Sequence, residues 1–149
     1  MNHIPDANQL QKTQDTVLAM PMARTLRLRF CSCSPGQVEL EIPIHEAFTF
    51  QPGQLQATPV FAIADFAGVA AAATLLPPGW INATVDANLK LVAPAKGLML
   101  RAKGKVVHAG RLLTICAADV YAVSHSGEET LCATLLGTAR NIDMTKIHS

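Results

Sequence analysis

One acidic residue, Asp65, lies at the centre of the most apolar segment of the sequence, between Ala64 and Phe66. Burying a carboxylate in such surroundings costs free energy unless the group is paired or used in chemistry. Acids whose pKa is raised by burial are common in active sites, although they are not confined to them. Asp65 is therefore the first candidate for a catalytic residue. A buried acid paired with a donor, or one that faces a water-filled subunit interface, is the alternative interpretation.

The short segment Gln56-Ala57-Thr58 precedes Pro59 at the predicted start of a helix that contains Asp65. Backbone N–H groups at a helix N-terminus have no intrahelical partner and can bind a developing oxyanion. Small side chains also let a substrate carbonyl approach closely. An ordinary helix cap explains the same residues, and from these residues alone it is the simpler interpretation.

Two further groups of polar residues could line a site. Thr84, Asp86 and Asn88 alternate along the strand expected after the helix, so a period of two predicts that they share one face. That face is either a solvated edge or part of a site. Positively charged side chains gather around two later turns. They could bind phosphate groups, or they could simply cover a solvated strand face. The residues are Lys96, Arg101, Lys103, Lys105, His108 and Arg111.

The elements that position these residues can be placed from hydrophobic periodicity. Residues 6–20 form an amphipathic pattern that ends at Pro21, which predicts a helix. Residues 25–33 and 37–42 alternate around a Ser-Pro-Gly turn, which predicts two antiparallel strands. Residues 48–53 are expected to form a loop.

The central helix is expected to begin with Thr58 as its N-cap and Pro59 at its first position, and to stop at Pro77-Pro78-Gly79. Its faces are apolar nearly all round, so it should be enclosed by protein. Four strands are expected after it, over residues 82–92, 98–108, 111–123 and 130–141. The order of two strands, one buried helix and four strands predicts an α+β fold in which an antiparallel sheet wraps around a single helix.

Composition limits the possible functions. A chain of 149 residues with 50% hydrophobic and 15% charged residues predicts one domain whose surplus apolar surface is covered in an oligomer. A net charge of +1 without a basic cluster argues against nucleic acid as a partner. The apolar segment over residues 62–76 is too short for a membrane span, and the polar N-terminus is unlike a signal peptide, so a cytoplasmic protein is expected.

The four cysteines do not form the two close pairs that a zinc site would need, so no metal and no cofactor are expected. Cys31 and Cys33 fit better as small, reduced strand residues.

The stretch from Gly53 to Gly97 resembles the PaaI-like hotdog thioesterases. In that family the helix opens with His-Gly-Gly, carries an Asp nine residues after the His, and is followed by a strand that reads Val-Asp-x-Asn and then by Pro-Ala. Asp65 falls at the acid position, Val85-Asp86-Ala87-Asn88 matches the strand, and Pro94-Ala95 matches the turn. Residues 106–111 also resemble the hairpin that follows, so the resemblance covers roughly residues 37–142.

The resemblance implies a hotdog domain over residues 23–143, with an N-terminal helical extension over 1–22 and a tail over 144–149. It further implies a homodimer or a tetramer of paired dimers that hydrolyses acyl-CoA at sites shared between subunits. Asp65 would act as base or nucleophile, the Ala57 N–H as oxyanion donor, and Thr84 would orient the water. The remaining expected substrate contacts are Phe50, Gln51, Thr58, Asn88, Lys96, Lys103, His108 and Arg111.

The start of the helix departs from the family pattern. Gln56 stands at the His position, Ala57 and Thr58 replace the two glycines, and Phe50 stands near a position that is often polar. Ala57 keeps its backbone donor if its φ is negative, and Gln56 can still donate a hydrogen bond. The alternative is a non-catalytic hotdog module that binds an acyl thioester. A hotdog dehydratase would need a histidine that this segment lacks.

Overall fold

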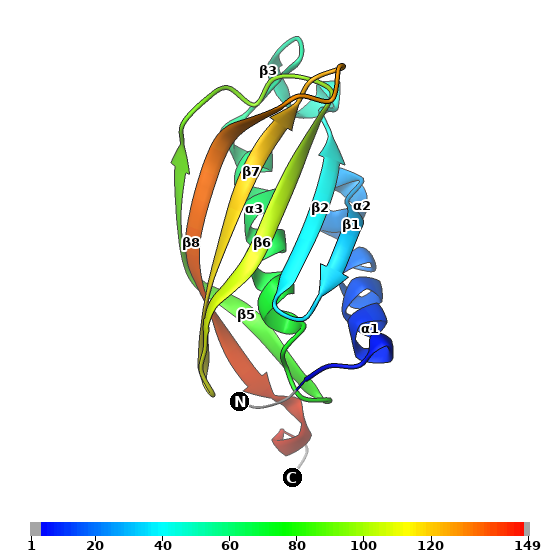
Figure 1. Cartoon of the computed structure of the whole chain (residues 1–149), viewed down its shortest axis with the longest axis vertical. Helices are drawn as coiled ribbons and strands as arrows, with labels where there is room; N and C mark the ends of the chain where they lie inside the picture. The colour runs from blue at the N-terminus through cyan, green and yellow to red at the C-terminus, as the bar shows by residue number, and fades with distance from the viewer. Residues whose placement is uncertain (1–3, 148–149) are drawn as a thin grey trace.

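The structure is a computed structural model that describes residues 4–147 (Figure 1). One long helix, α3 (Ala57–Ala73), packs against an antiparallel six-stranded sheet, and α1 (Ala7–Leu18) and α2 (Pro21–Leu26) precede the first strand. The strand order is β1-β2-β6-β7-β8-β5, so β5 forms one edge of the sheet. In the chain, β5 is the element that follows α3. The six strands are β1 (Arg29–Ser34), β2 (Gln37–Pro43), β5 (Trp80–Leu91), β6 (Met99–Ala109), β7 (Leu113–Val123) and β8 (Glu129–Asp143).

Most of the expected elements are confirmed. The α+β architecture and the four strands after α3 agree with the alternation in the sequence, to within a few residues at each end. The N-terminal helix α1 is also present, where Asp6 caps the backbone N–H of Gln9 and the Gln9 side chain accepts from the Asp6 N–H. Such a reciprocal capping box satisfies two otherwise unpaired donors.

Three local expectations are wrong. Residues 25–26 belong to α2 instead of a strand, because Pro21 starts a short helix and Arg27 ends it with a left-handed backbone (φ 58°). The expected loop over 48–53 instead contains the end of a 3₁₀ turn, η1 (Glu46–Phe48), and the first strand and turn of a hairpin formed by β3 (Thr49–Gln51) and β4 (Gln54–Leu55). Finally, α3 begins one residue before Thr58, with Gln56 at the N-cap and Pro59 at the third position.

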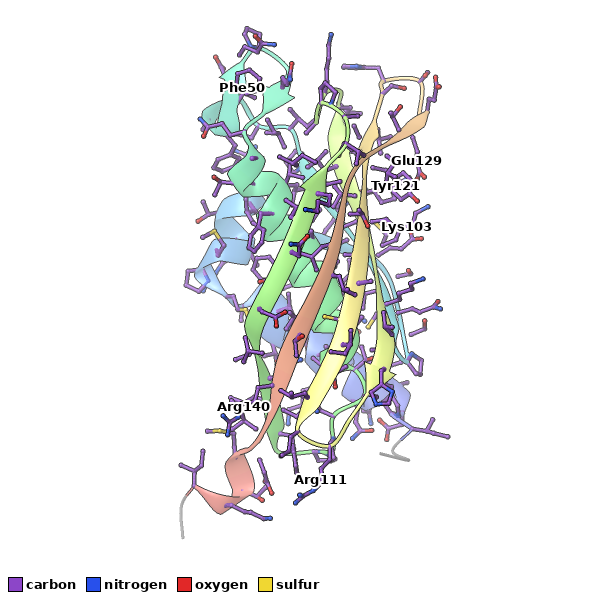
Figure 2. The ribbon with its side chains drawn as sticks, turned by 90° about the vertical axis from the view of Figure 1, so that its left-hand side faces the viewer. Phe50, Lys103, Arg111, Tyr121, Glu129 and Arg140 are labelled. Atoms are coloured by element: carbon purple, nitrogen blue, oxygen red, sulfur yellow. The ribbon has the colours of Figure 1, made fainter. Side chains whose placement is uncertain are left out.

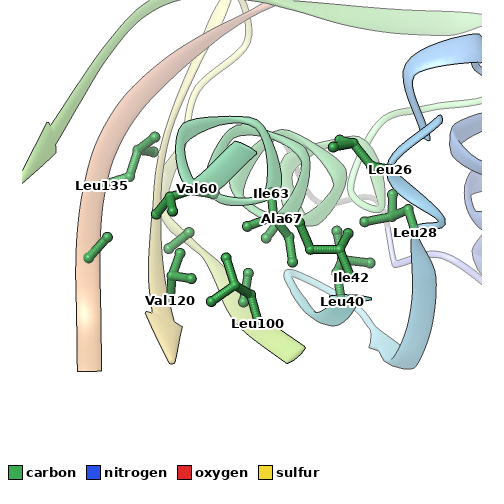
Figure 3. Packing of buried hydrophobic residues seen from close by; sticks show 14 of the residues in the cluster. Leu26, Leu28, Leu40, Ile42, Val60, Ile63, Ala67, Leu100, Val120 and Leu135 are labelled. Atoms are coloured by element: carbon green, nitrogen blue, oxygen red, sulfur yellow. The ribbon is translucent and has the colours of Figure 1, made fainter. Parts of the chain in front are cut away.

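The core lies between α3 and the concave face of the sheet (Figure 3). Large side chains from several strands, among them Leu40, Ile42, Leu100 and Val120, are fully buried around the helix. The helix meets them with mostly small side chains, because Ala64, Ala67 and Ala71 are inaccessible to solvent. No helix in the described part of the chain has the length and apolar character needed to cross a membrane.

The backbone of α3 comes very close to the sheet at Gly104 of β6. A β-carbon built at this glycine would lie 2.1 Å from the carbonyl oxygen of Ala67, far inside van der Waals contact. Gly68 is also tight, since a β-carbon there would lie 3.2 Å from the sulfur of Cys116 on β7. The backbones of helix and sheet therefore touch at a position where no side chain fits.

Replacing Gly104 with alanine should therefore force α3 away from the sheet. We expect the free energy of unfolding to fall by at least about 2 kcal/mol, within the range for overpacked cores. Urea unfolding followed by circular dichroism measures the loss. Lys105→Ala, on the exposed neighbouring position of β6, is the control and should change stability by less than about 0.5 kcal/mol. Equal stability of Gly104→Ala and the parent would contradict the close contact.

Candidate active site

Asp65 on α3 and Thr84 on β5 form the centre of the candidate site. The Thr84 hydroxyl donates a hydrogen bond of 2.9 Å to Asp65 Oδ1. Asp65 is half-buried, whereas Thr84 is exposed, so the pair lies at the margin of the core on the side of the β5 edge. A second bond, from the Asn82 amide to the Val69 carbonyl oxygen (3.0 Å), fixes the same part of β5 to α3. The two bonds hold the carboxylate in one position relative to the strand.

The electrostatics of Asp65 are those of a desolvated acid without a counter-ion. Burial raises the pKa of Asp65 above its ordinary value, and the hydrogen bond from Thr84 offsets part of that effect. Within residues 4–147 no cation forms an ion pair with this carboxylate. The interpretation of Asp65 as half of a dry internal ion pair is thus not supported.

A β-bulge changes which residues share a face with Thr84. The pairing of β5 with β8 shifts between Thr84 and Asp86, leaving Val85 as the extra residue. After the bulge Ala87 and Leu89 pack against the core, so Asp86 and Asn88 lie on the face away from α3. The expectation that Thr84, Asp86 and Asn88 share one face is therefore wrong, because the extra residue reverses the alternation.

The start of α3 presents two backbone donors. Gln56 is the N-cap without a side-chain capping bond, and its own N–H donates to the Phe48 carbonyl oxygen (3.0 Å). The first-turn residues Ala57 and Thr58 are exposed, and Pro59 has no N–H. Among described non-glycine residues only Arg27 has a positive φ, so Ala57 and Thr58 have the ordinary backbone that L-residues adopt. Ala57 and Thr58 therefore present the same backbone N–H groups that the two glycines of the family pattern would present.

The acid and these donors are too far apart to act together in one chain. Asp65 lies eight positions after Ala57, which corresponds to about 12 Å along an α-helix. A carbonyl group held by the Ala57 N–H would therefore be out of reach of the same chain's carboxylate. Asp65 and the donors at the start of α3 therefore do not meet within one chain.

The positively charged candidates do not gather at one place. Lys96 lies in the turn before β6 and pairs with Gln54 of β4, beside the start of α3. Arg111 lies in the β6–β7 turn at the opposite end of the molecule from Phe50 (Figure 2). His108, near the same end of β6, is exposed. The Gln51 side chain bonds that of Gln54 (2.7 Å) in the β3–β4 hairpin.

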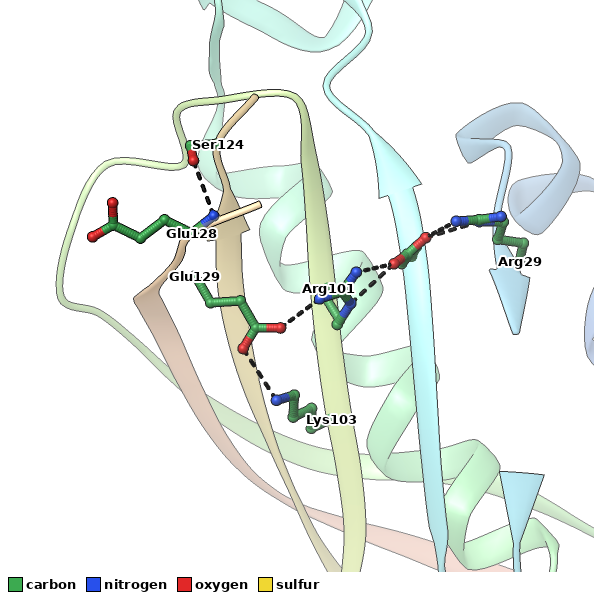
Figure 4. A network of polar contacts seen from close by, with 7 residues as sticks. Arg29, Arg101, Lys103, Ser124, Glu128 and Glu129 are labelled. Atoms are coloured by element: carbon green, nitrogen blue, oxygen red, sulfur yellow. Dashed lines mark hydrogen bonds and ion pairs between the residues drawn. The ribbon is translucent and has the colours of Figure 1, made fainter. Parts of the chain in front are cut away.

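Lys103 belongs to an ionic network on the sheet that sequence patterns did not reveal (Figure 4). Its Nζ donates to Glu129 (3.1 Å) and lies 4.8 Å from the centre of the Tyr121 ring. Arg101 joins Glu129 to the buried Glu41, which Arg29 also binds. Burial alone would raise the pKa of Glu41, but the two guanidinium groups lower it below its usual value. Acids alternate along β2 and bases alternate along β6. Once the two strands are paired, acids lie opposite bases, so this alternation is the sequence signal for the ionic network.

The cysteines offer no activated nucleophile. Burial raises the pKa of Cys116 and of Cys132 to about 11, so both thiols stay protonated at neutral pH. All four cysteines are free. No cluster of three potential metal ligands occurs in the part of the chain that the structure describes.

Replacing Asp65 with asparagine should stabilise the protein at neutral pH. The folded state holds the Asp65 proton more tightly than the unfolded chain does, so the residue favours folding at low pH and loses that contribution as the pH rises through its folded pKa. Asparagine stays neutral and can still accept from Thr84. Thermal unfolding should show a melting temperature higher by a few degrees at pH 7, with a difference that shrinks toward pH 4. If the parent protein is more stable than Asp65→Asn at pH 7, the conclusion that burial destabilises the charged form of Asp65 is wrong.

Comparison with known proteins places this arrangement in a family. A thioesterase family protein from Silicibacter pomeroyi is 33% identical, with a TM-score of 0.87 over 91% of this chain and 98% of its own. A thioesterase from Haemophilus influenzae (17% identity, TM-score 0.79, 94% of each chain) and the Escherichia coli PaaI protein of the phenylacetic acid degradation operon (14%, 0.78, 91% and 95%) share the fold. No protein-family model and no curated protein sequence matches the chain. The chain therefore belongs to the thioesterase family, in the hotdog-fold form that PaaI also has.

Proposed function

We propose that the protein hydrolyses acyl-CoA thioesters, with Asp65 as the residue that activates or performs the attack. The observation that carries this proposal is a desolvated carboxylate that no cation within residues 4–147 pairs with and that Thr84 fixes beside the exposed edge of the sheet. Because burial raises its pKa, such a group is a stronger base than an ordinary aspartate.

The chemistry follows from the two carboxylate oxygens. Thr84 donates to Oδ1, which leaves Oδ2 to accept a proton from a water molecule. The water oxygen attacks the thioester carbonyl carbon, the C–S bond breaks, and the proton passes to the CoA thiolate, leaving a carboxylic acid. Direct attack by the carboxylate, followed by hydrolysis of the anhydride, needs the same ionised Asp65. Thr84 serves either route by orienting the carboxylate, and through it the water.

The oxyanion donor would come from Ala57 of the partner subunit. The donor N–H is available at an exposed helix start, and it lies too far from its own Asp65 to serve that residue. Gln56 and Thr58 flank the donor and would contact the same carbonyl group or its neighbouring atoms. Gln56 can donate through its amide where the family's histidine would.

A dimer paired through β5 would bring these groups together. β5 is a 12-residue edge strand that leaves Ile81, Val85 and Leu91 exposed, which is unusual for an edge meant to face water. Antiparallel pairing of two such edges would set the two copies of α3 side by side in opposite directions. The start of each helix would then lie near the middle of the other, where Asp65 is. Two such dimers could assemble further into a tetramer.

The CoA portion would bind near the helix start. Lys96, Phe50 and Gln51 lie at that end of the molecule and are the candidates for contacts near the thioester and for the nearest phosphate groups. Asn88 follows the bulge on the exposed β5 edge. Lys103, His108 and Arg111 are farther from the helix start, so we assign them to more distant parts of CoA.

Activity measurements on Asp65→Asn test the proposal. We expect hydrolysis of acyl-CoA thioesters by the parent and a loss of at least about 100-fold in kcat/KM for the variant, as for other acid–base groups. A thiol-trapping dye reports the released CoA. Asp119→Asn is a matched control, because Asp119 accepts a hydrogen bond from Thr134 (2.7 Å) as Asp65 does from Thr84 but lies on β7.

Equal rates for the parent and Asp65→Asn would overturn the assignment of Asp65. Binding of acyl-CoA without any hydrolysis by the parent would favour a non-catalytic module, for which Gln56-Ala57-Thr58 in place of His-Gly-Gly is the supporting observation.

A further inference from the structure

A groove of about 620 Å³ runs between α1, α3 and the first half of β5. Asp65 and Thr84 line this groove together with α1, so the groove is continuous with the candidate active site. Its volume lies within the range of sites that enclose small organic ligands. The sequence does not indicate a role for α1, and lining this groove is a role that the structure suggests.

One face of α1 forms the outer wall. The lining residues Gln9, Thr13 and Thr16 recur at helical spacing along that face, and Met20 lines the groove just beyond the end of α1. The helix is fixed in this position, because its capping box secures the first turn and Val17 is buried against the core. The wall is thus a built part of the domain.

The floor of the groove is apolar and extends away from the acid. It is made by α3, where Phe66, Val69 and Ala73 follow Asp65 at helical spacing, and by Trp80 and Ile81 at the start of β5. Asp65 and Ala73 are eight residues apart, which corresponds to about 12 Å of helix. An extended hydrocarbon chain whose carbonyl group lies at Asp65 would follow this floor toward the C-terminal end of α3.

We propose that this groove is the acyl pocket and that α1 is its outer wall, so that the preferred substrates carry an apolar acyl group well beyond acetyl in length. The inference rests on the proposed thioesterase activity for the placement of the carbonyl group. Side chains of α1, Thr16 in particular, would then determine which acyl groups fit.

Trp80 gives a direct test, because it lines the groove and the sequence contains a single tryptophan. In Asp65→Asn, which preserves the ligand, decanoyl-CoA should change the Trp80 emission and CoA alone should not. Thr16→Phe, added to this background, should weaken decanoyl-CoA binding by at least about tenfold. Ala73→Leu, which narrows the groove from the opposite wall, should do the same.

Asn8→Phe is the matched control, since Asn8 is exposed on α1 away from the groove; binding should stay within about twofold. The pocket is ruled out if decanoyl-CoA and CoA give the same Trp80 emission, or if Thr16→Phe and Asn8→Phe bind decanoyl-CoA equally well. The two proposals fail separately. A Trp80 response without turnover by the parent would end the thioesterase proposal alone, whereas turnover without a Trp80 response would end the pocket alone.

Discussion

The backbone contact between α3 and the sheet determines where every other functional group lies. Gly104 lets the helix backbone touch β6, and the alanines on the same face of α3 let the helix sit flat on the strands. With that face fixed, the adjacent face with Asp65 points toward the β5 edge and α1. The carboxylate is consequently half-desolvated instead of fully buried or fully hydrated. The raised pKa of Asp65, its bond with Thr84 and the groove beyond it all follow from this one packing arrangement.

Much of this fold could be predicted from the sequence, because the signals were local. Alternation marked the last four strands, and an apolar segment that ends at Pro77-Pro78-Gly79 marked the enclosed helix. The start of α3 could not be placed, since proline is accepted throughout the first helical turn and Pro59 fits its first and third positions equally well. Residues 25–26 alternate like a strand, but the left-handed Arg27 closes a helical turn there. That choice depends on how the turn packs, which periodicity does not describe.

The site was predictable only in part, for the same reason. Asp65 was conspicuous because an acid in an apolar helix is costly, and Thr84 on the next strand does bond it. The bulge at Val85 was not predictable, since one extra residue leaves no compositional mark yet turns Asp86 and Asn88 to the other face. In the sequence the basic residues gathered around two neighbouring turns. In three dimensions the pairing of β2 with β6 commits Arg101 to Glu41, while the length of β6 separates Lys96 from Arg111.

The central claim is that each active site joins Asp65 of one subunit to the helix start of another, and mixed dimers test it most directly. Ala57→Pro removes the donor N–H at a helix position where proline is well tolerated, and Asp65→Asn removes the acid. Each variant alone should be nearly inactive. After unfolding and refolding together in equal amounts, half of the dimers would contain one intact site of two, so about a quarter of the parental activity should return. If the mixture is no more active than the separate variants, the site is not shared between subunits.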